Sequence, residues 1–488
     1  MRRRGVDRRA TAAALGAREL QTAAGRLSIE ATAQRLVLGK LGCARNDVFL
    51  CQQDDDLQAV PPFHIAFSEE KMDGSLLAVA DEEGCLSFYN TRDARPRLPP
   101  QHQPHDHAPP IARIAAHENA IFDMIWCNQD AYIATASGDQ QIGIWDVETG
   151  AHVYHLSGHS MSVKCIRQHP MHPSVFASGS RDGNVFLWDA RLPPPPLVAG
   201  PPVPRLLRPF TGCARCHDYE VPTDRRKKRR VSVPNTQRSV TCIEFTGDGT
   251  QMISAGAVDG HVKFWDVRHL FPPATPPKLP QHVRSLACHA PSGRRYGISS
   301  LSLDHTKSRL LVSAASNEIL LYDLLAATDV PVAKFHGHRN SSFYVKSAFS
   351  PESRFIVSGS VDQRVYIWDV AQAGLPVRVL HGHEGEVSSV AWSRRDFTKL
   401  ASCSDDGTVR VWTMRRGGDS KDDAAVCGRG CAMGYSTPYE PPAVVADEAP
   451  PEVQAPMPPP TPEATTAPSP TPAARPVRQM LTLHHFWR

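Results

Sequence analysis

A short pattern recurs along the middle of the chain: a hydrophobic run that ends in an aromatic residue followed by a polar one. Its clearest copies are IGIWDV at Trp145, VFLWDA at Trp188, VYIWDV at Trp368 and VRVWTM at Trp412. Consecutive tryptophans in this set are 43 residues apart in one case and 44 in another. That period is the length of one four-stranded propeller blade. The repeat therefore predicts an all-β ring.

Three weaker copies complete the set, namely LSFYNT at Tyr89, VKFWDV at Trp265 and ILLYDL at Tyr322. Seven copies predict a seven-bladed propeller that runs from about Asn46 to about Arg416. An open ring would leave two unpaired strand edges. We expect NDVFLCQ, residues 46–52, to supply the closing strand beside the last blade.

Four copies also share a histidine, a hydroxyl residue, an aspartate and the final tryptophan. The histidines are His117, His159, His338 and His383; the hydroxyl residues are Thr135, Ser178, Ser358 and Ser402; the aspartates are Asp139, Asp182, Asp362 and Asp406. An indole N–H needs an acceptor, a hydroxyl both donates and accepts, and an imidazole bridges to a carboxylate. We interpret the set as a buried structural relay. The copy at Trp265 has Asp259 but no Gly-His.

The segments around the repeats differ in composition, and the chain has 43 prolines, many of them clustered. Residues 1–45 are predicted to be a disordered basic arm, although their Arg- and Ala-rich composition is also typical of a mitochondrial transit peptide. Loop insertions are predicted at 192–204 and 213–237. Residues 417–488 read as a disordered tail rich in Pro and Ala.

No nucleotide-binding, hydrolase or metalloprotease motif is present, so no catalytic residue, metal site or cofactor is predicted. The net charge of +4 does not indicate a general nucleic-acid binder. Most of the cysteines lie singly in hydrophobic runs, as free buried thiols do, and no apolar run is long enough to span a membrane. CARCH, residues 213–217, matches a haem-attachment pattern but lies in a polar loop, and a zinc site there would lack a fourth ligand.

Six consecutive basic residues, Arg225, Arg226, Lys227, Lys228, Arg229 and Arg230, lie in the second insertion. Such a run is typical of a nuclear import signal or a nucleic-acid contact, and a solvated charge run is the alternative. We expect a nuclear protein.

The copy that begins at His338 is longer than its siblings. Nine residues separate His117 from Trp126, whereas eleven separate His338 from Phe349. The extra residues fall in RNSSFY, and we hypothesise that Arg339, Asn340, Phe343 and Tyr344 form a substrate-binding loop. The alternative is a β-bulge.

Two neighbouring copies extend the Trp-Asp pair to Trp-Asp-x-Arg. The residues are Trp188, Asp189 and Arg191 in one copy and Trp265, Asp266 and Arg268 in the next. This pattern resembles that of the substrate receptors of cullin-4 ubiquitin ligases. The resemblance implies that these residues bind the DDB adaptor on the broad face, where a planar guanidinium suits carboxylates and carbonyls.

A wider resemblance covers about residues 60–415. HENAIFDMIW, SAGAVDGHVKFWDVR, GHRNSSFYVKSAFSPESRFIVSGS and GHEGEVSSVAWSRRDFTKLASCSDDGTVRVW are similar to segments of the denticleless family of WD-repeat proteins. That family implies a non-enzymatic ligase subunit that recruits proteins bound to the sliding clamp PCNA on chromatin, among them a replication licensing factor. The main alternative is a WD-repeat scaffold for histones or chromatin factors, and an enzyme is the third.

The C-terminus ends in MLTLHHFWR. A PCNA-binding PIP box has a glutamine first, an aliphatic residue fourth and aromatics seventh and eighth. Counting from Met480 places Leu483, Phe486 and Trp487 correctly, but the glutamine is missing. One helical turn would bring the three apolar side chains to one side, so we predict a PIP-like PCNA-binding motif.

Overall fold

The computed structural model describes residues 32–44, 47–52, 58–92, 108–191, 204–217, 238–270, 281–288, 295–326, 328–342, 344–414 and 434–441. The chain divides into two compact units, residues 1–439 with 479–488, and residues 440–478. Every strand given below belongs to the first unit. Its described residues are almost entirely β structure, as the repeat predicts, with a helix at 32–38 and short 3-10 helices η2 (Lys71–Gly74) and η4 (Val267–His269).

The strands form antiparallel meanders, each called here by its inner strand. The β3 blade contains β3 (Pro62–Phe67), β4 (Leu76–Asp81), β5 (Cys85–Asn90) and β6 (Ala112–Ala115). The β7 blade contains β7 (Ile121–Cys127), β8 (Tyr132–Ser137), β9 (Gln141–Asp146) and β10 (His152–Ser157), with β14 (Arg205–Leu207) added in parallel to β10. The β11 blade contains β11 (Val163–Gln168), β12 (Val175–Ser180), β13 (Val185–Asp189) and β15 (Thr211–Cys213).

The remaining meanders follow the same plan. The β16 blade contains β16 (Val240–Phe245), β17 (Gln251–Gly256), β18 (His261–Asp266) and β19 (Arg284–Ala287). The β20 blade contains β20 (Ile298–Leu303), β21 (Arg309–Ala314), β22 (Glu318–Asp323) and β23 (Ala333–Phe335). The β24 blade contains β24 (Ser347–Phe349), β25 (Phe355–Ser358), β26 (Arg364–Asp369) and β27 (Arg378–His381). The β28 blade contains β28 (Val387–Trp392), β29 (Leu400–Ser404) and β30 (Thr408–Met414).

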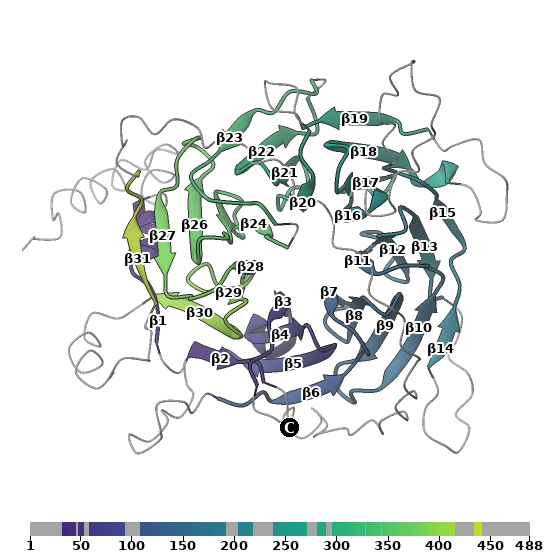
Figure 1. Cartoon of the computed structure of the whole chain (residues 1–488), viewed down its shortest axis with the longest axis horizontal. Helices are drawn as coiled ribbons and strands as arrows, with labels where there is room; N and C mark the ends of the chain where they lie inside the picture. Colours follow the sequence, from purple (N-terminus) through teal and green to yellow (C-terminus); the bar gives the residue numbers. More distant parts are fainter. Residues whose placement is uncertain are drawn as a thin grey trace, which may run out of the picture. The chain divides into compact units, whose positions relative to one another are not determined.

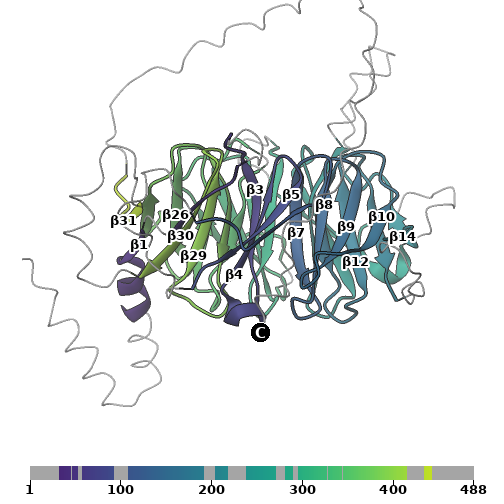
Figure 2. The ribbon, with the colours of Figure 1, turned by 90° about the horizontal axis from the view of Figure 1, so that it is seen from below.

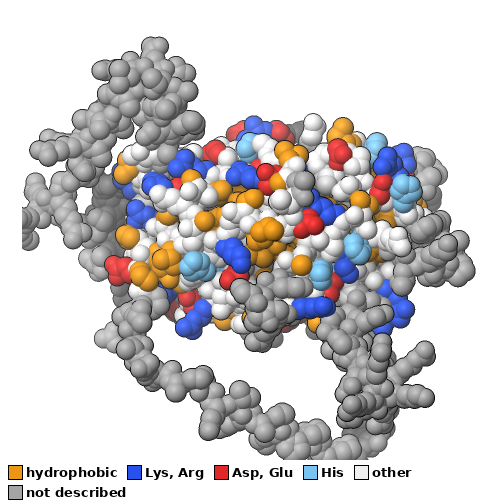
Figure 3. Space-filling view, turned by 90° about the horizontal axis from the view of Figure 1, so that it is seen from above, with side chains coloured by type: hydrophobic (Ala, Val, Ile, Leu, Met, Phe, Trp, Pro, Cys, Tyr) orange, Lys and Arg blue, Asp and Glu red, His pale blue; other side chains and the backbone are white. Residues whose placement is uncertain are grey.

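The inner strands close into a ring. Each contacts the next in the order β3, β7, β11, β16, β20, β24 and β28, and β28 contacts β3 in turn (Figure 1). Seen from the side, the strands run between the two faces of the ring (Figure 2). On the part of the outer wall that Figure 3 shows, basic, acidic and hydrophobic side chains are interspersed.

Both ends of the described chain pair at one place. β2 (Val48–Leu50) lies antiparallel to β30, with Val48 opposite Arg410, so the predicted closing strand is confirmed. β1 (Leu41–Cys43) extends the same edge of β30. β31 (Gly434–Pro438) pairs with β27 on one side and with β1 on the other, which joins the β24 and β28 blades into one ten-stranded sheet.

These pairings correct two predicted boundaries. Residues 32–44 are not a disordered arm, because Leu38, Leu41 and Cys43 are buried and Arg35 forms a 2.7 Å ion pair with Asp369. Residues 434–438 are a strand and not part of a disordered tail. Residues 1–31 and 442–488 lie outside the described part of the chain.

The second insertion also begins later than predicted. Cys213 ends β15, and Cys216 and His217 are buried, so residues 213–217 belong to the β11 and β16 blades and not to the insertion. Residues 192–203 and 218–237 lie outside the described ranges, and β14 and β15 follow the first of them.

The predicted relay forms in three of its four copies. In the β28 blade, Trp412 Nε1 donates to Ser402 Oγ at 2.8 Å, His383 Nε2 lies 2.8 Å from the same oxygen, and His383 Nδ1 lies 3.0 Å from Asp406. An indole only donates and a carboxylate only accepts, so the hydroxyl donates to Nε2 and Nδ1–H donates to the aspartate. The relays at His117 and His159 have the same geometry.

A further relay occurs where the sequence did not indicate one. His217, the last residue of CARCH, has Nδ1 2.8 Å from Asp259 and Nε2 2.8 Å from Ser254 Oγ, which accepts from Trp265. The motif therefore supplies the missing histidine of the β16 blade. His217 therefore has a structural role inside the β16 blade.

The relay predicted at His338 is wrong. Both ring nitrogens of His338 are buried without a hydrogen-bond partner. The Tyr366 hydroxyl donates to Asp362 at 2.6 Å, and the Trp368 indole donates to the backbone carbonyl of His336 at 3.0 Å. The relay is replaced by other bonds: Tyr366 bonds one oxygen of Asp362, the Ser358 hydroxyl donates to the Gly359 carbonyl, and the indole bonds a carbonyl. The second oxygen of Asp362 is also buried without a hydrogen-bond partner. Burial lowers the pKa of His338 to about 4.

Candidate protein-binding sites on the two faces of the ring

The two faces are defined by strand direction. Within each blade the first and third strands run the same way, because both are antiparallel to the second. We call the side where inner strands begin the entry face and the side where they end the exit face. A residue that follows a third strand, such as Arg191 after β13, therefore lies on the exit face.

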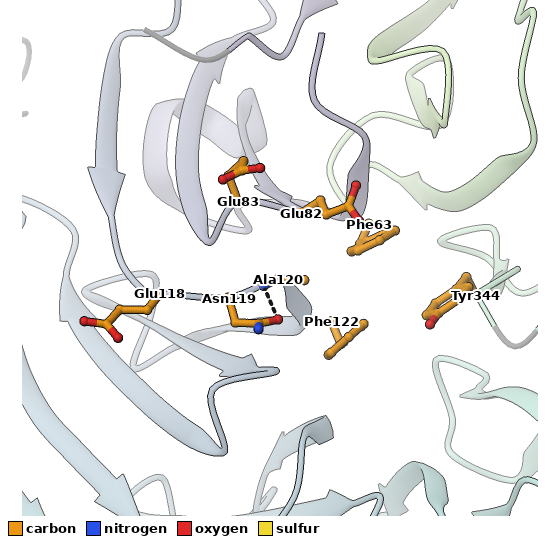
Figure 4. A pocket seen from close by; sticks show the side chains of 8 residues that line it. All are labelled: Phe63, Glu82, Glu83, Glu118, Asn119, Ala120, Phe122 and Tyr344. Carbon is orange, nitrogen blue, oxygen red and sulfur yellow. Dashed lines mark hydrogen bonds between the residues drawn. The ribbon is translucent and has the colours of Figure 1, made fainter. Parts of the chain in front are cut away.

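Three aromatic rings stack on the entry face. Phe63 comes from β3, Phe122 from β7, and Tyr344 from the segment before β24 (Figure 4). The ring centroids of Phe63 and Tyr344 are 5.4 Å apart, those of Phe63 and Phe122 5.7 Å, and those of Phe122 and Tyr344 6.1 Å. Their planes lie within 15° of parallel. Tyr344 is 43% exposed, so the stack offers an apolar surface to a partner.

Opposite charges flank the stack. On one side it lines a cavity of about 410 Å³ with Glu82, Glu83 and Glu118, whose side chains are exposed. On the other side Lys164 Nζ lies 3.1 Å from the centre of the Phe122 ring. Burial and the positive charge of Arg181 lower the pKa of Lys164 to about 8. The entry face thus has an apolar centre between an acidic rim and a basic one.

The channel below the stack holds a buried charge network across several blades. Asp123 accepts from Arg167 at 2.6 Å and from Lys346 at 3.0 Å, and Arg167 also donates to Glu244 at 2.6 Å. Although burial opposes ionisation, Arg167 and Lys346 hold the pKa of Asp123 well below its usual range. Burial and the charge of Lys346 lower the pKa of His64 to about 3. These groups line a cavity of about 510 Å³ and tie the β3, β7, β11, β16 and β24 blades together.

The predicted substrate loop is only partly at this site. Tyr344 belongs to the stack, and Arg339 is exposed. Asn340 is buried and donates to Ser299 Oγ at 3.0 Å, so its side chain has a packing role. Phe343 lies outside the described residues. Sequence reasoning missed Phe63, Phe122 and the glutamates, which an alignment of each repeat on its inner strand would have placed at the same end.

On the exit face, the two arginines of Trp-Asp-x-Arg are arranged alike. The Arg191 backbone N–H donates to Asp189 Oδ1 at 3.0 Å, and the Arg268 N–H donates to Asp266 Oδ1 at 2.9 Å. This is an Asx turn, which fixes the backbone of the residue two places on. Each guanidinium also bonds its own aspartate, and the bond from Arg268 lowers the pKa of Asp266. The arginine side chains remain 71% and 72% exposed.

The tryptophans of that motif are not exposed on the protein surface. Trp188 and Trp265 are buried and donate to relay hydroxyls inside their blades. Since both indoles are buried, the structure assigns them the role of holding the strand that ends in the Asx turn. The adaptor-binding role predicted for the motif stays a prediction, and Arg191 and Arg268 are the residues placed to make the contact. Arg191 and Arg268 come from the neighbouring β11 and β16 blades and are the exposed members.

Several other predictions fall on residues that the structure does not describe. These are the basic run Arg225–Arg230 and the C-terminal residues Met480, Leu483, Phe486 and Trp487. Within the described ranges, no cluster of His, Cys, Asp or Glu is arranged to hold a metal, the cysteines are free, and no helix is long and apolar enough to cross a membrane.

The family described as "WD domain, G-beta repeat" matches residues 108–146, 150–189, 228–266, 329–369 and 374–413. Three curated relatives are the Denticleless protein homolog of Danio rerio, 36% identical over 77% of this chain, that of Homo sapiens, 37% over 74%, and Protein lethal(2)denticleless of Drosophila melanogaster, 31% over 70%. The alignments cover 55%, 48% and 43% of those proteins, so the chain spans about half their length.

Proposed function

Because this chain is a WD-repeat protein of the Denticleless family, we propose that it is the substrate receptor of a nuclear cullin-4 RING E3 ubiquitin ligase. It binds the DDB adaptor and recruits PCNA-bound replication and cell-cycle proteins for ubiquitination and degradation. It has no chemistry of its own, because the ligase's other subunits transfer ubiquitin and this chain supplies proximity.

The observation that carries the proposal is the pair of exposed arginines on matching Asx turns. Both guanidiniums lie at the same position of adjacent blades. Within the described residues, the hydrogen bonds of each guanidinium go to its own aspartate and not to another blade. An arginine fork that is already held by its own aspartate loses less conformational freedom when it meets a carboxylate or carbonyl on a partner. That is the form of a preorganised binding patch.

A ring of seven blades is part of the proposal. It is supported by the closed order of the inner strands β3, β7, β11, β16, β20, β24 and β28. The five matched repeats cover all the blades except those that begin with β3 and β20, whose third strands contain Tyr89 and Tyr322 where the others have tryptophan.

The entry face is the proposed substrate site, on the side of the ring away from the adaptor. The stack of Phe63, Phe122 and Tyr344 suits an apolar or aromatic side chain of an extended peptide. The acidic rim formed by Glu82, Glu83 and Glu118 suits a basic neighbour of that side chain.

Two segments outside the described residues complete the proposal. The basic run 225–230 directs the chain to the nucleus, and the PIP-like motif at 480–487 binds PCNA. A receptor that holds the same loaded clamp as its substrate raises the effective concentration of that substrate at the entry face.

The test is binding of the purified full chain to immobilised DDB adaptor. Arg191→Ala with Arg268→Ala should lower affinity by at least a hundredfold, because hot-spot arginines commonly cost about 2 kcal/mol each. The matched control is Arg394→Ala with Arg395→Ala, which removes two arginines from the loop after β28 on the same face. Wild-type affinity of the Arg191 and Arg268 variant would refute the receptor assignment; binding of basic histone tails at the acidic rim, without adaptor binding, would favour a chromatin scaffold.

A further inference from the structure

The Asx-turn position of Arg191 and Arg268 recurs in other blades. The backbone N–H two residues after the third-strand Asp or Asn donates to that side chain at 2.9–3.0 Å in six blades. The residues held in this way are Arg92, Glu148, Arg191, Arg268, Leu325 and Ala371. In these six blades the fold therefore presents one side chain on the exit face, at an equivalent place in each.

Leu325 is the unusual member of this series. It follows Asp323 of β22, in the blade next to that of Arg268, and it is 83% exposed. A leucine at such a position gains nothing from the fold, because its side chain is left in water. Val283 and Val330, near the same end of the β16 and β20 blades, are also exposed.

The backbone that carries Leu325 is held in place. Arg284 of β19 donates to the carbonyls of Leu324 and Ala326 at 3.4 Å and of Thr328 at 2.8 Å, and to the Asp329 carboxylate at 2.7 Å. One guanidinium thus clamps both sides of Leu325 and joins its loop to the blade of Arg268. An exposed apolar residue on a fixed loop is a preorganised anchor, since little backbone freedom is lost when it is buried by a partner.

The other members of the series do not extend the patch. Arg92 of the β3 blade is bonded to Asp73 at 3.1 Å, Glu148 is bonded to Lys71 of the neighbouring blade at 2.6 Å, and Ala371 offers only a methyl group. The side chains suited to a partner are therefore consecutive: two arginines and then a leucine.

We propose that Leu325 is a third contact of the adaptor-binding surface, an apolar anchor beside Arg191 and Arg268. The inference rests on the proposed function. The partner chemistry that fits is a surface with carboxylate or carbonyl oxygens for the two guanidiniums and an adjacent apolar pocket for the leucine. Its burial excludes water from the flank of the charged pair, as the contacts around a hot spot do.

The experiment uses the full chain on immobilised DDB adaptor, with Leu325→Asp, Leu325→Ala and Leu325→Met beside the Arg191→Ala, Arg268→Ala variant. We expect Leu325→Asp to weaken binding about tenfold or more, mainly through faster dissociation, Leu325→Ala to weaken it less, and Leu325→Met to bind like wild type. Ala371→Asp is the matched control, because it places the same carboxylate on the same turn of another blade. Equal thermal midpoints check that each variant is folded.

The outcomes separate the two ideas. If the arginine variant loses binding while Leu325→Asp binds like wild type, the receptor function stands and the anchor is refuted. If Ala371→Asp weakens binding as much as Leu325→Asp, the effect is general charge repulsion and the anchor is also refuted. If the wild-type chain does not bind the adaptor, both fall.

Discussion

His217 and His338 make a matched pair for measuring what the buried relay contributes. Both are buried histidines near the indole of a third-strand tryptophan. His217 bonds at both ring nitrogens, whereas His338 bonds at neither. Replacing each with alanine removes a side chain of the same size, so the difference between the two variants reports the hydrogen bonds.

The structure gives the expected size of that difference. His217→Ala loses a bond to the Asp259 carboxylate, about 2 kcal/mol for a charged acceptor, and a bond with Ser254, about 1 kcal/mol. It also leaves a void, about 1 kcal/mol. Asp259 keeps Lys263 at 3.0 Å, so its charge is not left unpaired. The total is about 4 kcal/mol, whereas His338→Ala leaves only the void and removes two unsatisfied nitrogens, about 1 kcal/mol.

Urea unfolding followed by tryptophan fluorescence measures both variants against the wild-type chain. A ring of this size need not unfold in two states, so midpoints and slopes are compared together. The expected order is wild type, then His338→Ala, then His217→Ala well below both. Equal destabilisation by the two substitutions would show that ring packing, and not the relay bonds, holds these histidines.

Three further predictions concern the pH response and the segments beyond the ring. The pKa of His338 is lowered to about 4, so between pH 4 and about 6.5 the unfolded chain binds more protons than the folded chain, and the free energy of unfolding falls as the pH falls through this range. His338→Leu should remove up to about 3 kcal/mol of this pH dependence in unfolding measured from pH 6.5 to 4, and an unchanged pH dependence would contradict a neutral buried imidazole. Deleting residues 225–230 should move a fluorescent fusion from nucleus to cytoplasm with no change in thermal midpoint; a fusion that stays nuclear excludes this signal. A peptide of residues 476–488 should bind PCNA in a titration and lose binding when Phe486 and Trp487 are both alanine; no binding at high micromolar peptide would end the PIP-like interpretation.

The ring could be predicted from the sequence because its signals are local and periodic. A hydrophobic run that ends in Trp-Asp, such as Trp188-Asp189, marks a third strand, and its aspartate can accept a hydrogen bond from the backbone N–H two residues later. The closing strand at Val48 was predictable for a different reason, since a ring with an open edge is unfavourable.

The relay partners were harder to predict because the bonds are made across the fold. His217 is 37 residues from Ser254, whereas His383 is 19 residues from Ser402, and a long insertion separates the first pair. His338 has the expected spacing, but the Tyr366 hydroxyl bonds Asp362 instead. The spacing of the repeat does not show which of two donors an aspartate will bond. The pattern therefore overcounted one relay and missed another.

The entry face was missed for a similar reason, although an alignment of the repeats on their inner strands would have placed Phe63 and Phe122 at the same end. Phe63, Phe122 and Tyr344 are far apart in the chain and meet only because the ring closes. Each one alone resembles an ordinary core aromatic at a strand start. The deviation in repeat length pointed to Tyr344 but carried no information about its two neighbours.

The pairing of β2 with β30 has a consequence for how the chain is made. About 360 residues lie between Val48 and its partner Arg410. At a synthesis rate of 5–20 residues per second, the ribosome exposes the first edge about 20 to 70 s before the second exists. During that time Phe49 and Cys51, which are buried in the finished ring, have no native partner from β30. The N-terminal strand of a nascent chain therefore stays without its native partner until translation has passed the last repeat.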